Sequence, residues 1–256
     1  MLLDRRPFYC YHIIKNYDDF SVRKLLLYPS AILITALLPR KWWYWAAYYC
    51  AYAISFFLRK GMYNISQRYT RAERLNTLLA LITRCRKAYY IPISIKGFEH
   101  CSHPDSGLLL CTVHIPLLKV AIGKMLDNDV HIDAAIAAIP GPNNTMSFWG
   151  TTKQVAAILS DSKVLLKVKS ILQNNGTVTL MVDRYYGKPI SPNIFHLAAK
   201  TGTKLAYVLI ELLPNGQLVA KVIPPPHTIC TDEASVNENI AALKHEMDSL
   251  VGRYKS

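Results

Sequence analysis

A histidine at the end of an apolar strand is the first candidate for chemistry in this sequence. Residues 107–114 read Gly-Leu-Leu-Leu-Cys-Thr-Val-His, and His114 is followed by Ile115, Pro116 and a segment with helical spacing. Ligands of α/β proteins bind beyond the carboxyl ends of strands, where a histidine can take a proton from a bound substrate. We interpret His114 as a general base. The alternative is a histidine that caps the next helix or bonds to a loop.

The elements that must position this histidine alternate between strand-like and helix-like patterns from residue 89 onward. The expected strands are Tyr90–Lys96, Leu108–Val113, Val130–Ile139, Thr177–Val182, Lys204–Leu212 and Gln217–Ile223. The expected helices are 62–88, Ile115–Leu126, Thr152–Asn174, Asn193–Lys200 and Glu233–Val251. This alternation predicts an α/β fold with a mostly parallel sheet covered by helices. The turn Pro214-Asn215-Gly216 predicts a C-terminal hairpin at the edge of that sheet.

The front of the chain is both basic and apolar. Residues 1–100 contain 16 Lys and Arg against 5 Asp and Glu, yet residues 25–38 and 42–58 contain no charged residue. Both segments are shorter than the roughly 20 residues of a comfortable membrane span, and the second is dense in Trp and Tyr. We predict apolar membrane-associating helices within residues 1–60, anchored by flanking basic residues, and an α/β domain over 61–256. A single tilted span by 42–58, or two core helices, are the alternatives.

The same features indicate the partners and the compartment. Basic residues that flank apolar runs favour an anionic membrane face, and no nucleic-acid-binding module is recognised. The polar sequence that follows Met1 does not fit a cleavable signal peptide. Six cysteines without paired spacing favour free thiols in a reducing compartment. We therefore expect membrane lipids as partners, no nucleic acid, and a cytoplasmic location.

Four features together resemble the lipid A biosynthesis acyltransferases, which are the lauroyl/myristoyl transferases of the glycerolipid-acyltransferase superfamily. An apolar N-terminus and a basic helical stretch precede the α/β core. The strand of residues 107–114 is similar to the family's strand that ends in its catalytic histidine. Residues 175–187 look like the family's glycine, strand and Asp-containing loop, and residues 199–225 look like its final helix and two strands. The resemblance extends over residues 25–226.

This resemblance implies a membrane-associated enzyme, peripheral or monotopic, on the cytoplasmic face of the inner membrane. It would move a fatty acyl chain from an acyl-carrier-protein or coenzyme A thioester to a hydroxyl or amine. His114 would take the proton from the acceptor, whose heteroatom attacks the thioester carbonyl. No metal and no cofactor is implied, because the thioester is a co-substrate.

One position departs from the family motif, a histidine with an acid five positions later, because Lys119 stands where the acid is expected. A carboxylate there would orient the imidazole and favour its protonated form. Another carboxylate can replace it; we expect Asp133 first, and Asp127 or Asp129 less on distance. Alternatively, His114 works without an orienting acid. In the third hypothesis, the chain is a catalytically degenerate lipid-binding membrane protein of the same fold.

The remaining candidate site residues follow the expected strands. Asp183 ends a strand at the same edge as His114, where it positions the acceptor or shapes the site, or else caps a turn. Arg184 replaces the family's Gln, and is interpreted as an oxyanion or phosphate ligand or as a solvated arginine. Lys119 and Asn143 complete the predicted substrate-binding set. Because the loop with Asn143 replaces a region that is more basic in the family, we expect an acceptor smaller than lipid A.

Overall fold

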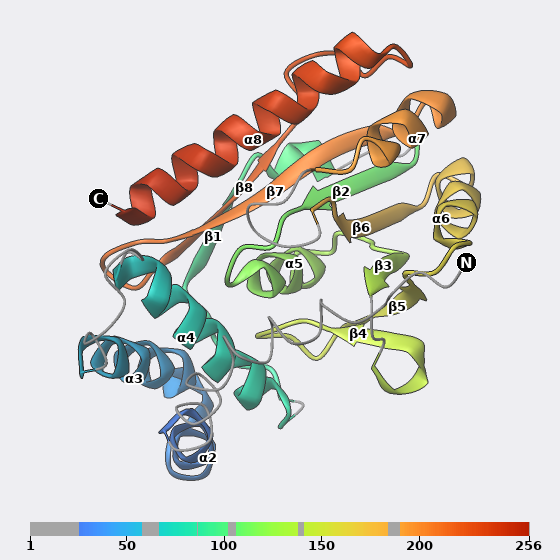
Figure 1. Ribbon diagram of the computed structural model, residues 1–256. Helices are drawn as coiled ribbons and strands as arrows, with labels where there is room; N and C mark the ends of the chain where they lie inside the picture. Colours follow the sequence, from blue (N-terminus) through green and yellow to red (C-terminus); the bar gives the residue numbers. More distant parts are fainter. Residues whose placement is uncertain are drawn as a thin grey trace, which may run out of the picture.

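An eight-stranded mixed sheet organises this chain in the computed structural model (Figure 1), which describes residues 26–57, 67–85, 87–101, 106–137, 141–183 and 190–255. The strands are β1 (Ile93–Lys96), β2 (Leu108–Thr112), β3 (Ala134–Ala137), β4 (Thr145–Ser147), β5 (Gln154–Leu159), β6 (Thr177–Met181), β7 (Lys204–Leu212) and β8 (Leu218–Ile223). Their order across the sheet is β1-β8-β7-β2-β6-β3-β5-β4. The helices are α2 (Tyr28–Leu37), α3 (Trp43–Phe57), α4 (Gln67–Thr83), α5 (Leu118–Asp127), α6 (Val164–Gln173), α7 (Asn193–Thr201) and α8 (Glu233–Lys255).

The centre of the sheet is parallel and covered on both faces. Strand β2 pairs in parallel with β6 and β7, and all five of its residues are buried. A strand that is buried on both faces needs apolar side chains at every position, which explains the unbroken apolar sequence Leu-Leu-Leu-Cys before Thr112. The continuous run therefore identified the central strand correctly.

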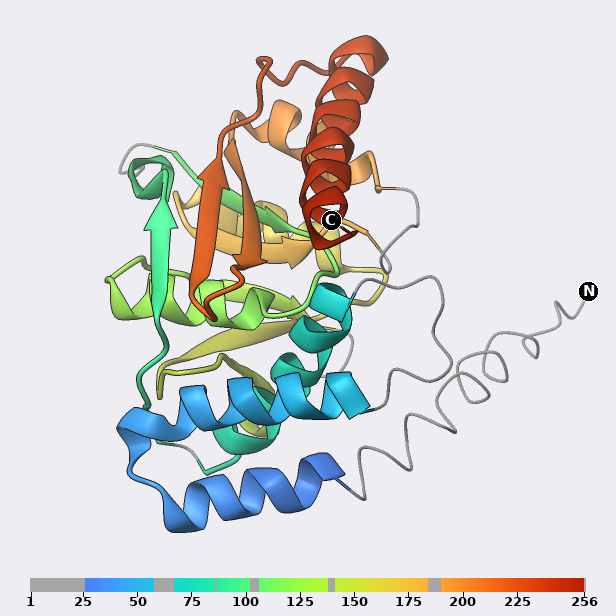
Figure 2. The same cartoon turned by 90° about the vertical axis from the view of Figure 1, so that its left-hand side faces the viewer.

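The crossover connections place α5 on one face of the central sheet and α6 and α7 on the other. The chain passes from β2 through α5 to β3 in one direction, and from β5 through α6 to β6 and through α7 to β7 in the other. Since such crossovers are right-handed, α5 lies on one face and α6 and α7 lie on the other. Tyr207 of β7 contacts Phe195 of α7 and bonds to the Asn239 carbonyl of α8, so α8 shares the face of α7. Figure 2 shows α5 and α8 on opposite sides of the sheet.

Two sequence predictions about the sheet are wrong. The C-terminal hairpin, β7 and β8, is not at the edge, because β1 pairs in parallel with the outer side of β8. The segment Thr152–Asn174 is not one long helix, because Gln154–Leu159 forms β5 and only Val164–Gln173 is helical. Pairing of β5 with β3 and β4 outweighs the helix-like spacing of its apolar residues.

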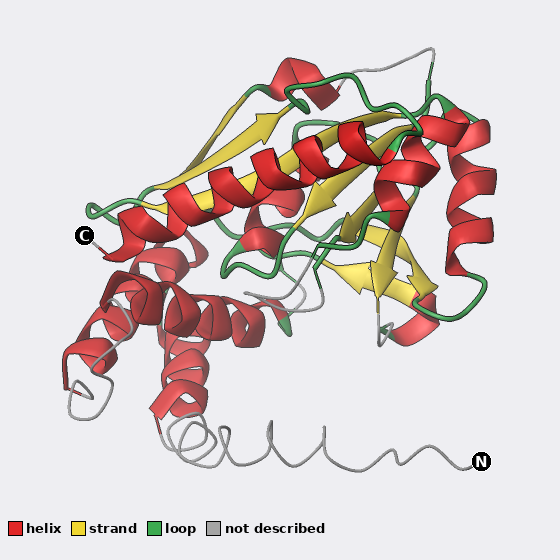
Figure 3. Ribbon diagram, turned by 45° about the horizontal axis from the view of Figure 1, so that its top comes forward, coloured by secondary structure: helices red, strands yellow, loops and turns green. Residues whose placement is uncertain are grey.

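The helices α2, α3 and α4 pack together at the carboxyl ends of the parallel strands (Figure 3). Two tyrosines of α3 attach this helical unit to the turn between β7 and β8. The Tyr44 hydroxyl donates to the Gly216 carbonyl at 2.5 Å, and the Tyr48 hydroxyl donates to the Pro214 carbonyl at 2.9 Å. The apolar N-terminal segments are therefore joined to the α/β domain by specific hydrogen bonds as well as by packing.

Helices α2 and α3 and the residues beside them expose many apolar side chains. Leu37 is 72% exposed, Tyr49 64% and Leu33 56%. The exposed large apolar side chains of the described residues 26–57 are Leu26, Tyr28, Ile32, Leu33, Leu37, Leu38, Trp42, Tyr49, Tyr52 and Phe56. We call these residues the α2–α3 apolar face. Within the described ranges, no helix combines the length and the hydropathy that a membrane span requires.

Candidate active site

His114 and Asp183 meet because their strands are neighbours in register. Thr112, the last residue of β2, is paired with Met181, the last residue of β6. Two further residues on each strand bring His114 opposite Asp183. The backbone N–H of Val182 donates to the Thr112 carbonyl at 2.9 Å, so the pairing continues beyond both strand ends. Both candidate site residues therefore lie at the carboxyl edge of the sheet, as predicted from the sequence.

The Asp183 carboxylate holds the His114 side chain and its backbone together. Its Oδ1 lies 2.9 Å from His114 Nδ1 and 2.9 Å from the His114 backbone nitrogen, and its Oδ2 lies 3.2 Å from that nitrogen. The Asp183 side chain is fully buried, whereas 36% of the His114 side chain is exposed. A buried carboxylate needs hydrogen-bond donors of this kind, because its burial without them would cost roughly several kcal/mol.

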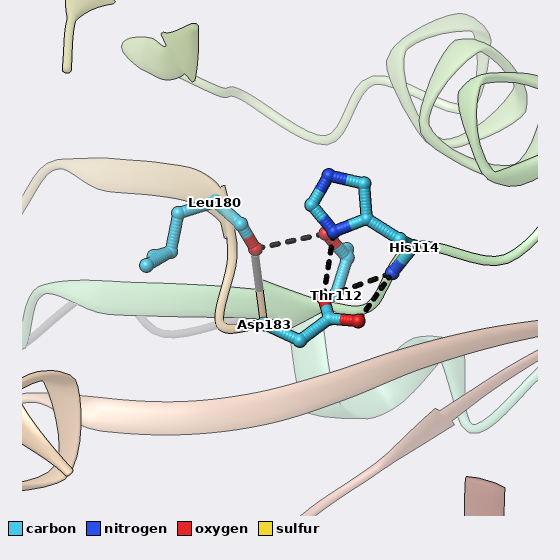
Figure 4. A network of polar contacts seen from close by, with 4 residues as sticks. All are labelled: Thr112, His114, Leu180 and Asp183. Carbon is cyan, nitrogen blue, oxygen red and sulfur yellow. Dashed lines mark hydrogen bonds and ion pairs between the residues drawn. The ribbon is translucent and has the colours of Figure 1, made fainter. Parts of the chain in front are cut away.

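This contact fixes which ring nitrogen of His114 is the base. A carboxylate only accepts hydrogen bonds, so Nδ1 donates its hydrogen to Asp183 and Nε2 keeps its lone pair. Figure 4 shows the second ring nitrogen pointing away from Asp183. The same figure shows the Thr112 hydroxyl donating to the Leu180 carbonyl at 2.8 Å, which ties β2 to β6 beneath the histidine. The arrangement suits an oriented general base.

The turn after His114 has an unusual backbone that α4 supports. Leu117 has φ of 69° and ψ of 0°, a left-handed conformation that bulky residues rarely adopt. Its backbone N–H donates to the Asn76 side-chain oxygen of α4 at 2.7 Å. Asn76 was not predicted as a site residue. Nothing local in the sequence marks it, because its partner is 41 residues away.

A narrow slot lies between α5 and the carboxyl ends of β2, β6 and β3. Thr112 of β2, Met181 of β6 and Ile122 of α5 are among its walls. Cys111 pairs with Tyr207 on the face of α7 and α8, so the next residue, Thr112, points to the opposite face, which α5 covers. Thr112 therefore lines the slot at the end of β2, and His114 follows two residues later.

Lys119 is part of this slot and forms no ion pair with a carboxylate of the described residues. It belongs to the first turn of α5, and burial lowers the pKa of its ammonium. Its Nζ lies 6.0 Å from the centroid of the Trp149 ring, and its carbonyl accepts a hydrogen bond from the Trp149 backbone N–H at 3.3 Å. The side chain of Lys119 thus connects α5 to the segment that follows β4.

Asp133, the acid expected first as the partner of His114, lies at the opposite edge of the sheet. The strand begins at Ala134 and not at residue 130, so Asp133 precedes β3 at its amino end. Its Oδ2 accepts the Thr177 backbone N–H at 2.7 Å, level with the start of β2, about 20 Å from His114 by strand rise. Its Oδ1 contacts His131 at 3.0 Å. The prediction of a His114–Asp133 pair is wrong.

The two other acids considered for His114 are also engaged elsewhere. Asp127 accepts the Thr151 hydroxyl at 2.6 Å, and Asp129 pairs with Lys153 at 3.1 Å. Both lie at the far end of α5 from His114. The acid that the structure provides is Asp183, which the sequence had placed at the correct edge with a different role.

The remaining predicted residues are not brought to His114. Asn143 is an exposed turn residue with φ of 58°, next to β4, and β4 lies four strand positions from β2, about 19 Å. Arg184 lies outside the described residues. Within the described ranges, no three His, Cys, Asp or Glu side chains gather as metal ligands would.

The similarity of this chain to known proteins is found at the level of structure. No model of a known protein family matches it, and no curated protein matches it. Among solved structures, it is similar to the crystal structure of the 1-acyl-sn-glycerophosphate (LPA) acyltransferase PlsC from Thermotoga maritima. The identity is 17%, the match covers 90% of this chain and 98% of that chain, and the TM-score is 0.45.

Proposed function

We propose that this protein is a membrane-associated acyltransferase that moves a fatty acyl chain from a thioester to a hydroxyl or amine, with His114 as the general base. The observation that supports it most is the 2.9 Å contact between His114 Nδ1 and the buried Asp183 carboxylate. It leaves Nε2 to accept a proton at the carboxyl edge of a parallel sheet, where substrates of α/β enzymes bind.

In the proposed reaction, Nε2 of His114 takes the proton of the acceptor O–H or N–H as the heteroatom attacks the thioester carbonyl. The carbonyl electrons move to oxygen, and the tetrahedral intermediate collapses by breaking the carbon–sulfur bond. The thiolate leaves with the bonding electrons and receives the proton from the imidazolium. Asp183 stabilises the imidazolium that forms in between, as the acid does in a Ser-His-Asp triad. The products are the acylated acceptor and a free thiol.

The location of the helical unit supports a substrate with a long acyl chain. The α2–α3 apolar face belongs to the same unit as α4, and α4 holds the turn after His114 through Asn76. Exposed apolar patches of this kind mark membrane or partner surfaces. We propose that this face enters one leaflet of the membrane and that basic residues contact anionic headgroups on the cytoplasmic side. An acyl-carrier-protein or coenzyme A thioester is the proposed donor.

The competing function, a degenerate lipid-binding protein, was motivated by Lys119 in place of the family's acid. Asp183 weakens that argument, because it supplies a buried carboxylate to the His114 imidazole from a different strand. The two functions differ in one measurable property. An enzyme consumes acyl thioester, whereas a binding protein retains it.

The test is thioester turnover by purified protein in liposomes, with acyl-carrier and acyl-coenzyme A donors and a mixture of lipid and amine acceptors. We expect turnover by the wild type and a loss of at least about 10³-fold in His114→Ala. His131→Ala is the matched control, because His131 also contacts a carboxylate but lies at the opposite edge of the sheet. Equal turnover by wild type and His114→Ala, or retention of acyl lipid without turnover, would overturn the proposal.

A further inference from the structure

Lys119 is half-buried, and its ammonium has no acidic partner among the described residues. Among the residues described by the structure, no carboxylate lies within ion-pair distance of it, and its recorded side-chain contact is with the Trp149 ring. Other lysines differ: Lys153 and Lys167 each pair with an aspartate. Buried ammonium groups are costly unless they are paired, so an uncompensated one indicates a site for a negative group.

The other polar groups of the slot are already satisfied. The Thr112 hydroxyl donates to the Leu180 carbonyl, and the Thr179 hydroxyl donates to the Leu110 carbonyl at 3.3 Å. Of the described residues that line the slot, Lys119 is the only charged one, and most of the others are apolar. A ligand group that enters the slot therefore finds one donor, and that donor is a cation.

The size and position of the slot restrict what can enter it. Its volume is about 30 Å³, which is room for one or two waters and hence for a group of a few heavy atoms, but not for an acyl chain. Thr112, the last residue of β2, is among its walls, two residues before His114. A group that binds in the slot therefore lies near the end of β2, which His114 follows.

We propose that Lys119 recognises an anionic oxygen group, a carboxylate or a phosphate, on the acyl acceptor while His114 deprotonates the acceptor's hydroxyl or amine. This inference rests on the function proposed above. The acceptor is favoured over the donor, because the phosphates of both proposed donors are separated from the thioester by the whole pantetheine arm. Burial that lowers the pKa of Lys119 agrees with a site in which an anion restores the ammonium.

The first experiment compares matched acceptors. Monoacylglycerol and its phosphate form one pair, and a primary alkylamine and the corresponding α-amino acid form the other. In the wild type and in Lys124→Met, a control lysine on the same helix, kcat/KM favours the anionic member of at least one pair by tenfold or more. In Lys119→Met this preference disappears. The neutral Met side chain retains the apolar stem and removes only the charge.

Two outcomes of this experiment overturn the inference. In one, the wild type transfers acyl chains equally well to the neutral and anionic members of both pairs, which leaves the acyltransferase function standing. In the other, Lys119→Met lowers turnover of neutral and anionic acceptors equally, which assigns the lysine to a step common to both, such as stabilisation of the oxyanion.

A binding experiment separates failure of this inference from failure of the proposed function. Butyl phosphate and butyrate are titrated against tryptophan fluorescence, with butanol as the neutral control. We expect a saturable change in the wild type and in Lys124→Met, no change in Lys119→Met, and none in Trp149→Phe, because Trp149 is the indole beside the ammonium. Absence of a saturable change in the wild type overturns the anion site, whether or not the protein turns over thioester.

Discussion

The side-chain oxygen of Asn76 accepts a hydrogen bond from the backbone N–H of Leu117 at 2.7 Å, and this contact joins α4 to the turn that follows His114. The turn bends through a left-handed residue, so it needs support from outside its own sequence. Asn76 therefore acts as a positioning residue: it connects the helical unit to the geometry of the candidate base without touching substrate.

Replacing Asn76 with Ala is expected to lower both stability and turnover. The Leu117 N–H would lose its partner, at a cost of about 1–3 kcal/mol, and displacement of the histidine would reduce kcat roughly 10- to 100-fold. Denaturant unfolding and thioester turnover measure the two effects. Asn76→Asp keeps the acceptor oxygen and should restore most of the activity, whereas Thr77→Ala on the same helix should leave kcat near the wild-type value. Full activity in Asn76→Ala would contradict the role given to this contact.

Asp183→Asn should keep the fold and impair catalysis. The amide can still accept the His114 backbone N–H, but it no longer carries the charge that stabilises the imidazolium or fixes the tautomer. We expect kcat to fall by about 10²- to 10⁴-fold with an unchanged circular dichroism spectrum. Asp133→Asn, in the other carboxylate–histidine pair, should remain active. If Asp133→Asn lost activity and Asp183→Asn kept it, Asp133 would be the functional acid.

Charges on the α2–α3 apolar face should weaken membrane association. Leu33→Asp with Leu37→Asp removes two exposed apolar side chains, each worth up to about 1.5–3 kcal/mol when buried in lipid. We expect the fraction bound to liposomes with anionic lipid to fall at least about tenfold in a sedimentation assay. Leu166→Asp, at an equally exposed leucine on α6, is the control and should bind as the wild type does. Equal binding by all three proteins would place the membrane contact elsewhere.

Gly123 of α5 is predicted to tolerate no larger side chain. A Cβ at this position would lie 2.5 Å from the Trp149 carbonyl oxygen, so Gly123→Ala must push α5 away from the segment after β4. We expect a loss of about 1–3 kcal/mol in the free energy of unfolding and altered anion binding at Lys119, whose Nζ lies near Trp149. Lys124→Ala, at the next residue, should unfold close to the wild type. A Gly123→Ala protein as stable as the wild type would show that this close approach is not required.

The lowered pKa of Lys119 predicts how its replacement changes stability with pH. The folded state disfavours the ammonium, so the folded pKa lies below the ordinary value of 10.5, and the folded protein is relatively destabilised at pH values below the folded pKa. Lys119→Met should therefore be more stable than the wild type at pH 7, and the difference should shrink as the pH rises toward 10.5. Chemical denaturation of both proteins at several pH values measures this. A stability difference between the two proteins that grows with pH would contradict this prediction.

The fold was predictable where each residue's own neighbours decide its structure. The unbroken apolar run of β2 and the turn at residues 214–216 each specify an element locally, and β7 spans the predicted Lys204–Leu212. The segment Gln154–Leu159 was misassigned because its five-residue apolar stretch suits a helix as well as a strand, and only its pairing with β3 and β4 decides. The position of β1 outside β8 is a long-range pairing that no local pattern encodes.

In the candidate site too, local sequence patterns were informative and long-range contacts were not predictable. His114 and Asp183 could be placed at one edge, because both follow apolar strands and parallel strands share their carboxyl edge. Their contact could not be predicted, since it depends on β6 being the neighbour of β2 and on the register Thr112 to Met181. Asp133 was preferred because the expected strand at 130–139 was interpreted as the neighbour of Leu108–Val113, whereas β6 lies between β2 and β3. The expected strand also began four residues too early, so Asp133 was placed inside a strand although it precedes β3.

The hydrogen bonds of Tyr44 and Tyr48 to residues 214–216 have a consequence for synthesis on the ribosome. Helix α3 leaves the ribosome well before the β7–β8 turn, and β1 likewise waits for β8 to supply its pairing partner. Contacts between such distant segments form slowly. During translation, the apolar N-terminal helices are thus synthesised before the sheet to which they will attach exists.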